Sequence, residues 1–266
     1  MHPLNIIKYP RTPHIEGSRL QPGDENLNQI PFEQIRHLTL TLEEKVDGAN
    51  VAISFDSDLN LRLQSRGHLL TGGAREGRYD LFKQWAAAHQ DVFRKRIGSR
   101  YIIYGEWLYV KHRLFYDALP HYFLEFDMLD TERDIFLGTD ARAELLSGLP
   151  VVSVPVLARG NFSSLEDLTA HLTHSRFITD AHTDILSRQA ESLGLDPGQV
   201  AAQTDLSTFM EGIYIKVEQY GAVTQRMKFV RPSFAQIDLP EQGRTRTTFL
   251  TNQLCRPFTD IFANCL

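Results

Sequence analysis

The sequence has few cysteines, no long apolar run and no excess of positive charge, and each of these limits what the protein can be. The 266 residues include only Cys255 and Cys265, with no His or Cys cluster beside them, which argues against a disulfide framework and a zinc site. No stretch approaches the roughly 20 apolar residues of a membrane helix, and the first residues lack the pattern of a secretory signal. We therefore expect a cytoplasmic protein without membrane contact. The formal net charge of -5 means that a nucleic-acid partner would have to be bound by local patches.

Clustered strand and helix patterns indicate an α+β fold. Runs rich in β-branched and aromatic residues predict strands at 37–44, 50–56, 59–67, 100–110, 121–129, 151–159, 211–219 and 225–231. Amphipathic periodicity predicts helices at 79–96, 140–148, 164–174 and 180–194. Because the strands come in clusters without regular βαβ alternation, we expect antiparallel sheets flanked by helices.

A single lysine stands between two strand runs in the segment KVDGAN, residues 45–50. We expect the two strands to pair, with Lys45 in a tight turn that Gly48 permits. Lys45 is then either a solvated hairpin charge or a reactive amine presented at a pocket. A lysine nucleophile must be neutral when it attacks, so its pKa, ordinarily about 10.4, must be lowered by nearby cations or by desolvation. The pattern KxDG alone is too short to decide between the two.

Charged residues also interrupt three later strand runs. They lie in YGEW at 104–107, EGIYIK at 211–216 and RMKF at 226–229. An unpaired charge in a buried strand is costly, so such side chains usually converge on a ligand or on each other. Structural salt bridges among these charged residues are the alternative to a binding site.

Together these segments resemble the motifs of the covalent nucleotidyltransferase superfamily of polynucleotide ligases and mRNA capping enzymes, and most closely its RNA ligase 2 branch. KVDGAN resembles motif I, SRG at 65–67 motif Ia, YGEW motif III, FLEFDML at 123–129 motif IIIa, EGIYIK motif IV and RMK at 226–228 motif V. One departure is Arg226, which stands where motif V usually has a lysine. The six motifs occur in the family's order.

We expect three parts of the chain. The five prolines and two glycines of residues 1–37 predict an irregular arm that runs over the domain surface. The resemblance implies that a nucleotidyltransferase domain with an ATP-grasp-like ligase fold spans 38–234. A short C-terminal extension at 235–266 would pack on this domain. Since the extension is too short for the five-stranded OB barrel of DNA ligases and capping enzymes, we expect no OB domain.

The activity implied by the resemblance is that of an ATP-dependent RNA ligase. Lys45 would attack the α-phosphorus of ATP and form lysyl-AMP, the AMP would pass to a 5'-phosphate end of RNA, and a 3'-hydroxyl end would displace it. The catalytic residues would be Lys45, Lys216 and Lys228. The residues in contact with ATP or AMP would be Glu44, Asn50, Arg66, Glu106, Phe126, Glu211 and Arg226.

Around the phosphates, Lys216, Arg226 and Lys228 would supply positive charge and lower the pKa of Lys45 by like-charge repulsion. Glu211 would help to place Mg²⁺ or Mn²⁺, through water, because magnesium keeps several of its waters. Asn50 would orient phosphate or ribose.

Around the nucleoside, Glu106 would contact the ribose and Arg66 the sugar and the substrate end. Phe126 would stack on adenine, and Glu44 would approach the adenine amino group. For Phe126 a place in the core, and for Arg66 a local turn contact, are the structural alternatives.

Several functional alternatives stay open. Motif I of DNA ligases usually ends in arginine, so Asn50 favours RNA over DNA. Without an appended nucleic-acid-binding domain, the chain would gather RNA through its arm or through a partner such as an end-healing kinase or phosphatase. The other hypotheses are a non-catalytic module that binds nucleotides or RNA ends, and a relative of DNA ligases or guanylyltransferases.

Overall fold

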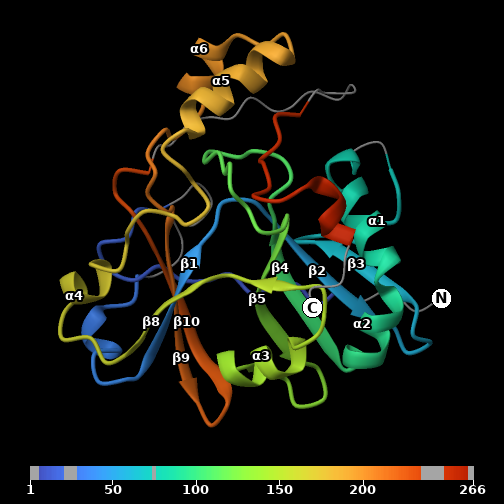
Figure 1. Cartoon of the computed structure of the whole chain (residues 1–266). Helices are drawn as coiled ribbons and strands as arrows, with labels where there is room; N and C mark the ends of the chain where they lie inside the picture. The colour runs from blue at the N-terminus through green and yellow to red at the C-terminus, as the bar shows by residue number, and fades with distance from the viewer. Residues whose placement is uncertain (1–5, 21–28, 74–75, 235–248, 263–266) are drawn as a thin grey trace.

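The computed structural model describes residues 6–20, 29–73, 76–234 and 249–262. Their strands form one continuous sheet of ten strands, nine of them in the order β3-β2-β4-β5-β6-β10-β9-β1-β8, with β7 beside β5 (Figure 1). All neighbours are antiparallel except β5 and β7. The strands are β1 Leu40–Lys45, β2 Ala49–Phe55, β3 Leu61–Ser65, β4 Tyr101–Trp107, β5 Phe123–Asp130, β6 Ile135–Leu137, β7 Val152–Ser153, β8 Val156–Gly160, β9 Gly212–Gln219 and β10 Ala222–Val230.

The short strand β6 makes one sheet out of what the sequence predicts as separate sheets. Residues of β6 pair with β5 on one side and with β10 on the other. The sequence analysis missed β6 because three residues are too few to show a period. The expected strand at 151–159 is instead the two strands β7 and β8, interrupted at Pro155, which has no N–H for a strand ladder.

The predicted pairing of the two strands around Lys45 is wrong. β1 pairs with β8 and β9, whereas β2 pairs with β3 and β4, so the connection at 46–48 passes from one half of the sheet to the other. Gly48 does not have a positive φ, so its backbone conformation is not the reason for glycine at this position. The reason is a lack of space, since an added Cβ would lie 2.6 Å from Leu108 Cδ2 and 2.8 Å from the Trp107 carbonyl oxygen. A true two-residue hairpin joins β9 to β10, with Tyr220 and Gly221 both at positive φ.

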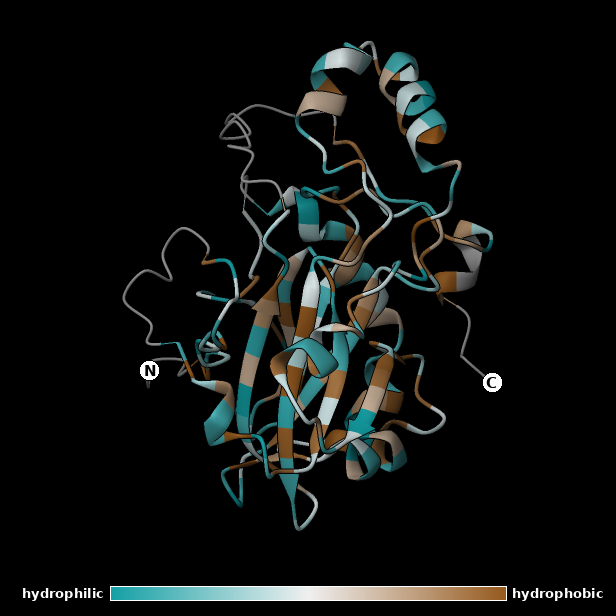
Figure 2. Ribbon diagram, turned by 90° about the vertical axis from the view of Figure 1, so that its left-hand side faces the viewer, coloured by the Kyte–Doolittle hydropathy of each residue, from teal (hydrophilic) through white to brown (hydrophobic). Residues whose placement is uncertain are grey.

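The helices lie around the sheet and at one end of it. They are α1 Asp80–Ala88, α2 Gln90–Ile97, α3 Thr139–Leu146, α4 Leu165–Thr169, α5 His182–Ser192 and α6 Pro197–Ala202. α1 and α2 replace the single helix predicted at 79–96, because His89 leaves the helical conformation and its ring bonds to the carbonyl oxygens of Trp85 and Phe262. α4 ends earlier than predicted, and α6 was not predicted. α5 and α6 project beyond the end of the sheet (Figure 2).

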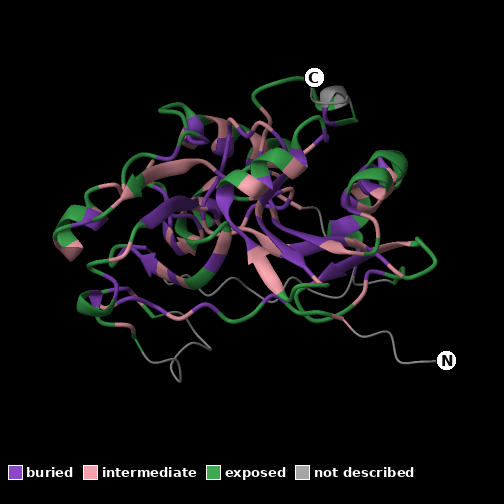
Figure 3. Ribbon diagram, turned by 90° about the horizontal axis from the view of Figure 1, so that it is seen from below, coloured by how far each residue is buried: buried purple, intermediate pink, exposed green. Residues whose placement is uncertain are grey.

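Two apolar clusters account for most of the core. The larger lies between the sheet and α1 and α2 and contains a group of aromatic rings, namely Phe82, Trp85, Phe93, Trp107 and Phe123. The smaller surrounds β1, β9 and β10 and includes Ile15 and Phe32 from the N-terminal arm. Figure 3 shows these buried segments along the middle of the sheet, with exposed residues at its margins.

The arm is more deeply integrated than the predicted surface course. Its backbone bonds to β10, with Lys228 N donating to the Pro13 carbonyl at 2.9 Å and Ile15 N donating to the Lys228 carbonyl at 3.0 Å. The side chains of Tyr9, Thr12 and Ile15 are buried. The arm thus covers an edge of β10 that β6 is too short to reach.

At the other end of the sequence, residues 249–262 pack back on the sheet. Asn252 is buried and bonds through its side chain to Tyr116 N and the Leu108 carbonyl. The expected extension at 235–266 lies partly outside the described residues. Among those that are described, no helix is long and apolar enough to cross a membrane.

Candidate active site

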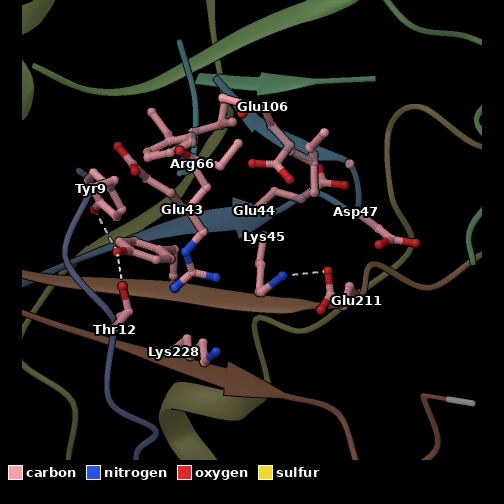
Figure 4. A pocket seen from close by; sticks show the side chains of 18 of the residues that line it. Tyr9, Thr12, Glu43, Glu44, Lys45, Asp47, Arg66, Glu106, Glu211 and Lys228 are labelled. Carbon is pink, nitrogen blue, oxygen red and sulfur yellow. Dashed lines mark hydrogen bonds and ion pairs between the residues drawn. The ribbon is translucent and has the colours of Figure 1, made fainter. Parts of the chain in front are cut away.

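A pocket of about 630 Å³ opens where β1 ends and β2 begins (Figure 4). Its walls come from β1, β2, β4, β5, β9, β10, the segment after β3 and the N-terminal arm. Eight of the ten residues predicted from the sequence line it: Glu44, Lys45, Asn50, Arg66, Glu106, Phe126, Glu211 and Lys228. The structure thus brings together side chains that are up to 184 positions apart in the sequence, from Glu44 to Lys228.

Lys45 is ion-paired at the bottom of this pocket. Its Nζ lies 2.6 Å from Oε2 of Glu211, and the two side chains are 20% and 1% exposed. The pair forms because Lys45 stands opposite Gly212 in the β1–β9 ladder, next to Glu211. Burial acts to lower the pKa of Lys45, but the carboxylates of Glu211, Glu106 and Asp47 outweigh it, and the pKa of Lys45 is raised. The expected lowering of this pKa by nearby cations is therefore wrong.

Glu106 and Asn50 lie directly across from each other on β4 and β2. Burial raises the pKa of Glu106 to about 8, although Lys45 acts to lower it. The Oδ1 atom of Asn50 is buried and has no hydrogen-bond partner among the described residues. An unpaired buried acceptor is costly, so this atom is suited to receive a ligand donor such as a hydroxyl group.

Asp47, which the sequence analysis did not assign to the site, fastens the loop that follows β4. Its Oδ2 accepts hydrogen bonds from the backbone N–H groups of Arg113 and Leu114 at 2.7 and 2.9 Å. Its own N–H donates to the hydroxyl of Tyr116 at 2.8 Å. The acidic residue of KVDG thus holds the backbone just after Lys45 in place.

Glu44 points in a different direction from its neighbour Lys45, because successive side chains alternate across a strand. Its Oε1 accepts a hydrogen bond from Ser175 Oγ at 2.5 Å. Burial raises the pKa of Glu44 to about 7, against the opposing effects of Ser175 and Arg176. The predicted contact of Glu44 with adenine stays a prediction.

Lys216 and Arg226 do not line the pocket. Lys216 is fully buried, with Nζ 2.8 Å from Glu43 Oε2 and 3.2 Å from Asp127 Oδ1. The guanidinium of Arg226 lies 3.8 Å from Asp127 Oδ2 and 3.6 Å above the ring of Phe136. Both cations are therefore neutralised within a buried ionic cluster, which explains why they do not lower the pKa of Lys45.

Arg142 of α3 completes this cluster, and the sequence analysis missed it. The side chain is 2% exposed and bridges Glu43 and Glu125. The contact with Arg142 fixes the side chain of Glu43, which lines the pocket. A lone arginine in a short helix gives no sign that it turns inward, since most helical arginines are solvated.

Comparison with known protein families identifies the family of the chain that forms this pocket. The sequence model of RNA ligases matches residues 38–230, which include all ten predicted site residues. The chain belongs to the RNA ligase family. This confirms the resemblance drawn from the motifs, whereas the RNA ligase 2 branch stays a prediction. No curated protein matches the chain.

A solved structure of an RNA ligase shares the fold of this chain. One mutant of Naegleria gruberi RNA ligase, determined with ATP and Mn, has a TM-score of 0.50 and 13% identity over 76% of this chain and 52% of that chain. A second mutant, with AMP and Mn, has a TM-score of 0.47 and 15% identity over 74% and 51%. The present chain thus spans about half the length of these structures.

The arm adds residues to the pocket that the sequence analysis missed. Tyr9 and Thr12 line it, together with Tyr214 of β9. The ring of Tyr9 packs edge-on against Phe126 with a centroid distance of 5.1 Å. A segment without strand or helix periodicity offers no pattern from which inward-facing side chains could be predicted.

Proposed function

We propose that this chain is an ATP-dependent RNA ligase of the RNA ligase 2 type that works through lysyl-AMP. The observation that carries the proposal is Lys45, an amine at the floor of a nucleotide-sized pocket, held by the nearly buried carboxylate of Glu211. A pocket with one oriented amine, a few polar groups and aromatic rings suits a nucleotide.

The reaction has three transfers at phosphorus. First, the neutral amine of Lys45 attacks the α-phosphorus of ATP, the bond to pyrophosphate breaks, and the nitrogen gives up one proton. Next, a 5'-phosphate oxygen of RNA attacks the AMP phosphorus, the bond from phosphorus to the Lys45 nitrogen breaks, and the nitrogen takes up one proton and leaves as the amine. Last, a 3'-hydroxyl attacks the activated 5'-phosphate, loses its proton, and AMP leaves. Such transfers depend on alignment and neutralised charge more than on acid or base groups.

The resting protein keeps Lys45 charged, because Glu211, Glu106 and Asp47 together raise its pKa. This cation is placed to attract the phosphates of an incoming nucleotide. Lys228 and Arg66 line the same pocket and supply further positive charge. Loss of the Lys45 proton then has to accompany a weakening of its contact with Glu211.

A divalent metal ion fits this site as a companion of the nucleotide. Among the described residues, no group of three or more His, Cys, Asp or Glu side chains could hold a metal ion. Mg²⁺ is commonly held by one or two carboxylates, substrate phosphates and water, and Glu211 is the carboxylate that would hold it, or Mn²⁺, through water. The bound ion would neutralise phosphate charge.

The proposed substrate is RNA with 5'-phosphate and 3'-hydroxyl ends, and an end-healing kinase or phosphatase would prepare such ends. The Asn50 form of motif I favours RNA over DNA.

The proposed domain is 38–234, with the arm at 1–37 and the extension at 235–266. A non-catalytic binding module would not need an amine in contact with the α-phosphate, so covalent labelling separates the two functions.

The test is covalent labelling with α-labelled ATP or GTP and Mg²⁺ or Mn²⁺, after treatment with pyrophosphate, followed by a denaturing gel. We expect label from ATP on the wild type and none on Lys45→Ala. Lys83→Ala is the matched control, since Lys83 is an ion-paired lysine on α1 outside the pocket. Label on Lys45→Ala, or no label on folded wild type with either nucleotide, would refute the proposal.

A further inference from the structure

Three hydroxyl groups form a chain along one wall of the pocket and end on a carboxylate. Thr12 Oγ1 lies 2.6 Å from the Tyr214 hydroxyl, which lies 2.6 Å from the Tyr9 hydroxyl. The Tyr9 hydroxyl donates to Asp127 Oδ2 at 2.6 Å. Two links of this chain appear as dashed lines in Figure 4, at the side of the pocket away from the Lys45–Glu211 pair.

The carboxylate sets the direction of every proton in the chain. Asp127 lies between the cations of Lys216 and Arg226, and its Oδ2 accepts the hydrogen bond from the Tyr9 hydroxyl. The single proton of Tyr9 therefore goes to Asp127, and the bond between the two tyrosines must be donated by Tyr214. Since Tyr214 then has no proton left, Thr12 must donate to Tyr214. Toward the pocket, the oxygen of Thr12 can only accept.

We expect the base of a bound nucleotide beside the hydroxyl chain, because this end of the pocket lies away from the Lys45–Glu211 pair and carries aromatic rings on which a base can stack. Tyr214 is two residues farther along β9 than Gly212, the residue opposite Lys45, and this corresponds to about 7 Å along a strand. The ring of Phe126 lies 6.3 Å from the ring of Tyr214, so this end of the pocket is aromatic.

We propose that Thr12 selects adenine over guanine by accepting a hydrogen bond from the 6-amino group. Guanine carries an oxygen at that position, and two acceptors facing each other leave both unsatisfied in a largely desolvated site. The inference rests on the proposed function, since it assigns the base specificity of the same pocket. Tyr9 is a positioning residue, because it acts on the base only through Tyr214 and Thr12.

The arm is held firmly enough for such a contact. Its backbone is bonded to Lys228 on both sides of His14. The Tyr9 ring packs against Tyr104, Phe126 and Phe136 with centroid distances of 5.1 to 5.7 Å. Thr12 itself is only 8% exposed. A contact made from this position costs little further ordering.

The test measures initial rates of covalent labelling at subsaturating ATP, GTP and purine riboside triphosphate, which lacks the 6-amino group. Thr12→Val should lower the rate with ATP about tenfold, the effect of losing one hydrogen bond of typical strength, and should not lower the rate with GTP. Wild type should use purine riboside triphosphate at least about tenfold less well than ATP, and this preference should be about tenfold smaller in Thr12→Val, since any contact of Glu44 with the amino group is the same in both proteins. Thr12→Ser, which keeps the hydroxyl, should keep the preference for ATP.

Tyr9→Phe tests the proton direction. Without the Tyr9 hydroxyl, Tyr214 can donate to Thr12, whose own proton can then face the guanine oxygen. The ratio of GTP to ATP use should therefore rise severalfold, which a merely structural role of Tyr9 would not cause. Thr224→Val is the matched control, because Thr224 is an exposed threonine of β10 that bonds to the Val217 carbonyl outside the pocket.

Two failures can be told apart. Absence of label on wild type with every nucleotide would overturn the proposed ligase function, and this inference with it. Normal labelling by ATP, with equal use of purine riboside triphosphate and an unchanged ratio of ATP to GTP in Thr12→Val, would overturn the role of Thr12 alone. The purine analogue needs no substitution, so equal use of it and ATP by the wild type overturns the role of Thr12 even where a variant fails to fold.

Discussion

Replacing Lys45 by alanine should destabilise the folded protein as well as abolish labelling. The Lys45–Glu211 distance is 2.6 Å, which corresponds to a Coulomb attraction of about 6 kcal/mol at an effective dielectric constant of about 20. The cost of desolvating both charges offsets much of this, and breaking a buried pair typically costs about 3–5 kcal/mol. Because the Lys45 side chain is 20% exposed, water can reach the vacated space. We therefore expect Lys45→Ala to lower the free energy of unfolding by about 2–3 kcal/mol near pH 8.

This cost should depend on pH. In the variant, Glu211 loses the nearby positive charge of Lys45, so its pKa should rise above its value in the wild type. The loss of stability is then greatest above the raised pKa and shrinks as the pH falls toward the ordinary carboxyl range. Urea unfolding, followed by the fluorescence of the buried Trp85 and Trp107, measures this directly.

A double-mutant cycle gives the decisive control. Glu211→Gln removes the buried charge, so Lys45→Ala should cost at least about 1 kcal/mol less in that background than in the wild type. Equal stability of wild type and Lys45→Ala at pH 8, or a coupling of zero, would refute the reasoning. Either result would mean that removing the positive charge of Lys45 from beside Glu211 does not lower the free energy of unfolding.

Three further substitutions test other parts of the site. Burial raises the pKa of Glu106 to about 8, above its unfolded value of about 4.3, so the folded protein loses stability as the pH rises through this range. Glutamine does not titrate, so the melting temperature of Glu106→Gln should fall less between pH 5 and 9 than that of the wild type. Parallel curves for the two proteins would contradict this reasoning. Arg226→Lys should lower the free energy of unfolding by about 1 kcal/mol in a urea titration, because an ammonium cannot stack on Phe136 as the guanidinium does. Unchanged stability would mean that this stacking contributes nothing. Gly48→Ala should cost about 2–3 kcal/mol by the same titration, since its Cβ would overlap neighbouring atoms, whereas Gly67→Ala, with nothing within 4 Å of the added atom, should have little effect.

Sequence patterns predicted where the strands lie in the sequence better than they predicted which strands pair. Apolar and polar alternation placed the strands around Lys45, but alternation says nothing about which strands pair, and the expected hairpin does not exist. The one-sheet arrangement depends on β6, which pairs locally with β5 but reaches β10 through a contact between residues far apart in the sequence. The break at His89 likewise comes from contacts with Trp85 and Phe262, the latter far away in the sequence.

For the site, motif matching brought out eight residues that share one pocket, because each motif combines residue types at short spacing. It could not show which charges neutralise one another. Lys216 and Arg226 have the residue types expected of phosphate ligands, yet both are held by Asp127. Thr12 was missed for the opposite reason, since it belongs to no motif and lies in an arm without periodicity.

The amino-acid sequence by itself determined the positions of the strands, the α+β class and the residue types of the RNA ligase motifs. These depend on short-range properties, namely side-chain alternation and local spacing. Only the tertiary structure decided that the pKa of Lys45 is raised, that two motif cations are buried in ion pairs, and that the N-terminal arm lines the pocket. The reason is that Coulomb energies, desolvation and hydrogen bonds depend on distances in space, which are set by strand pairing across the whole chain.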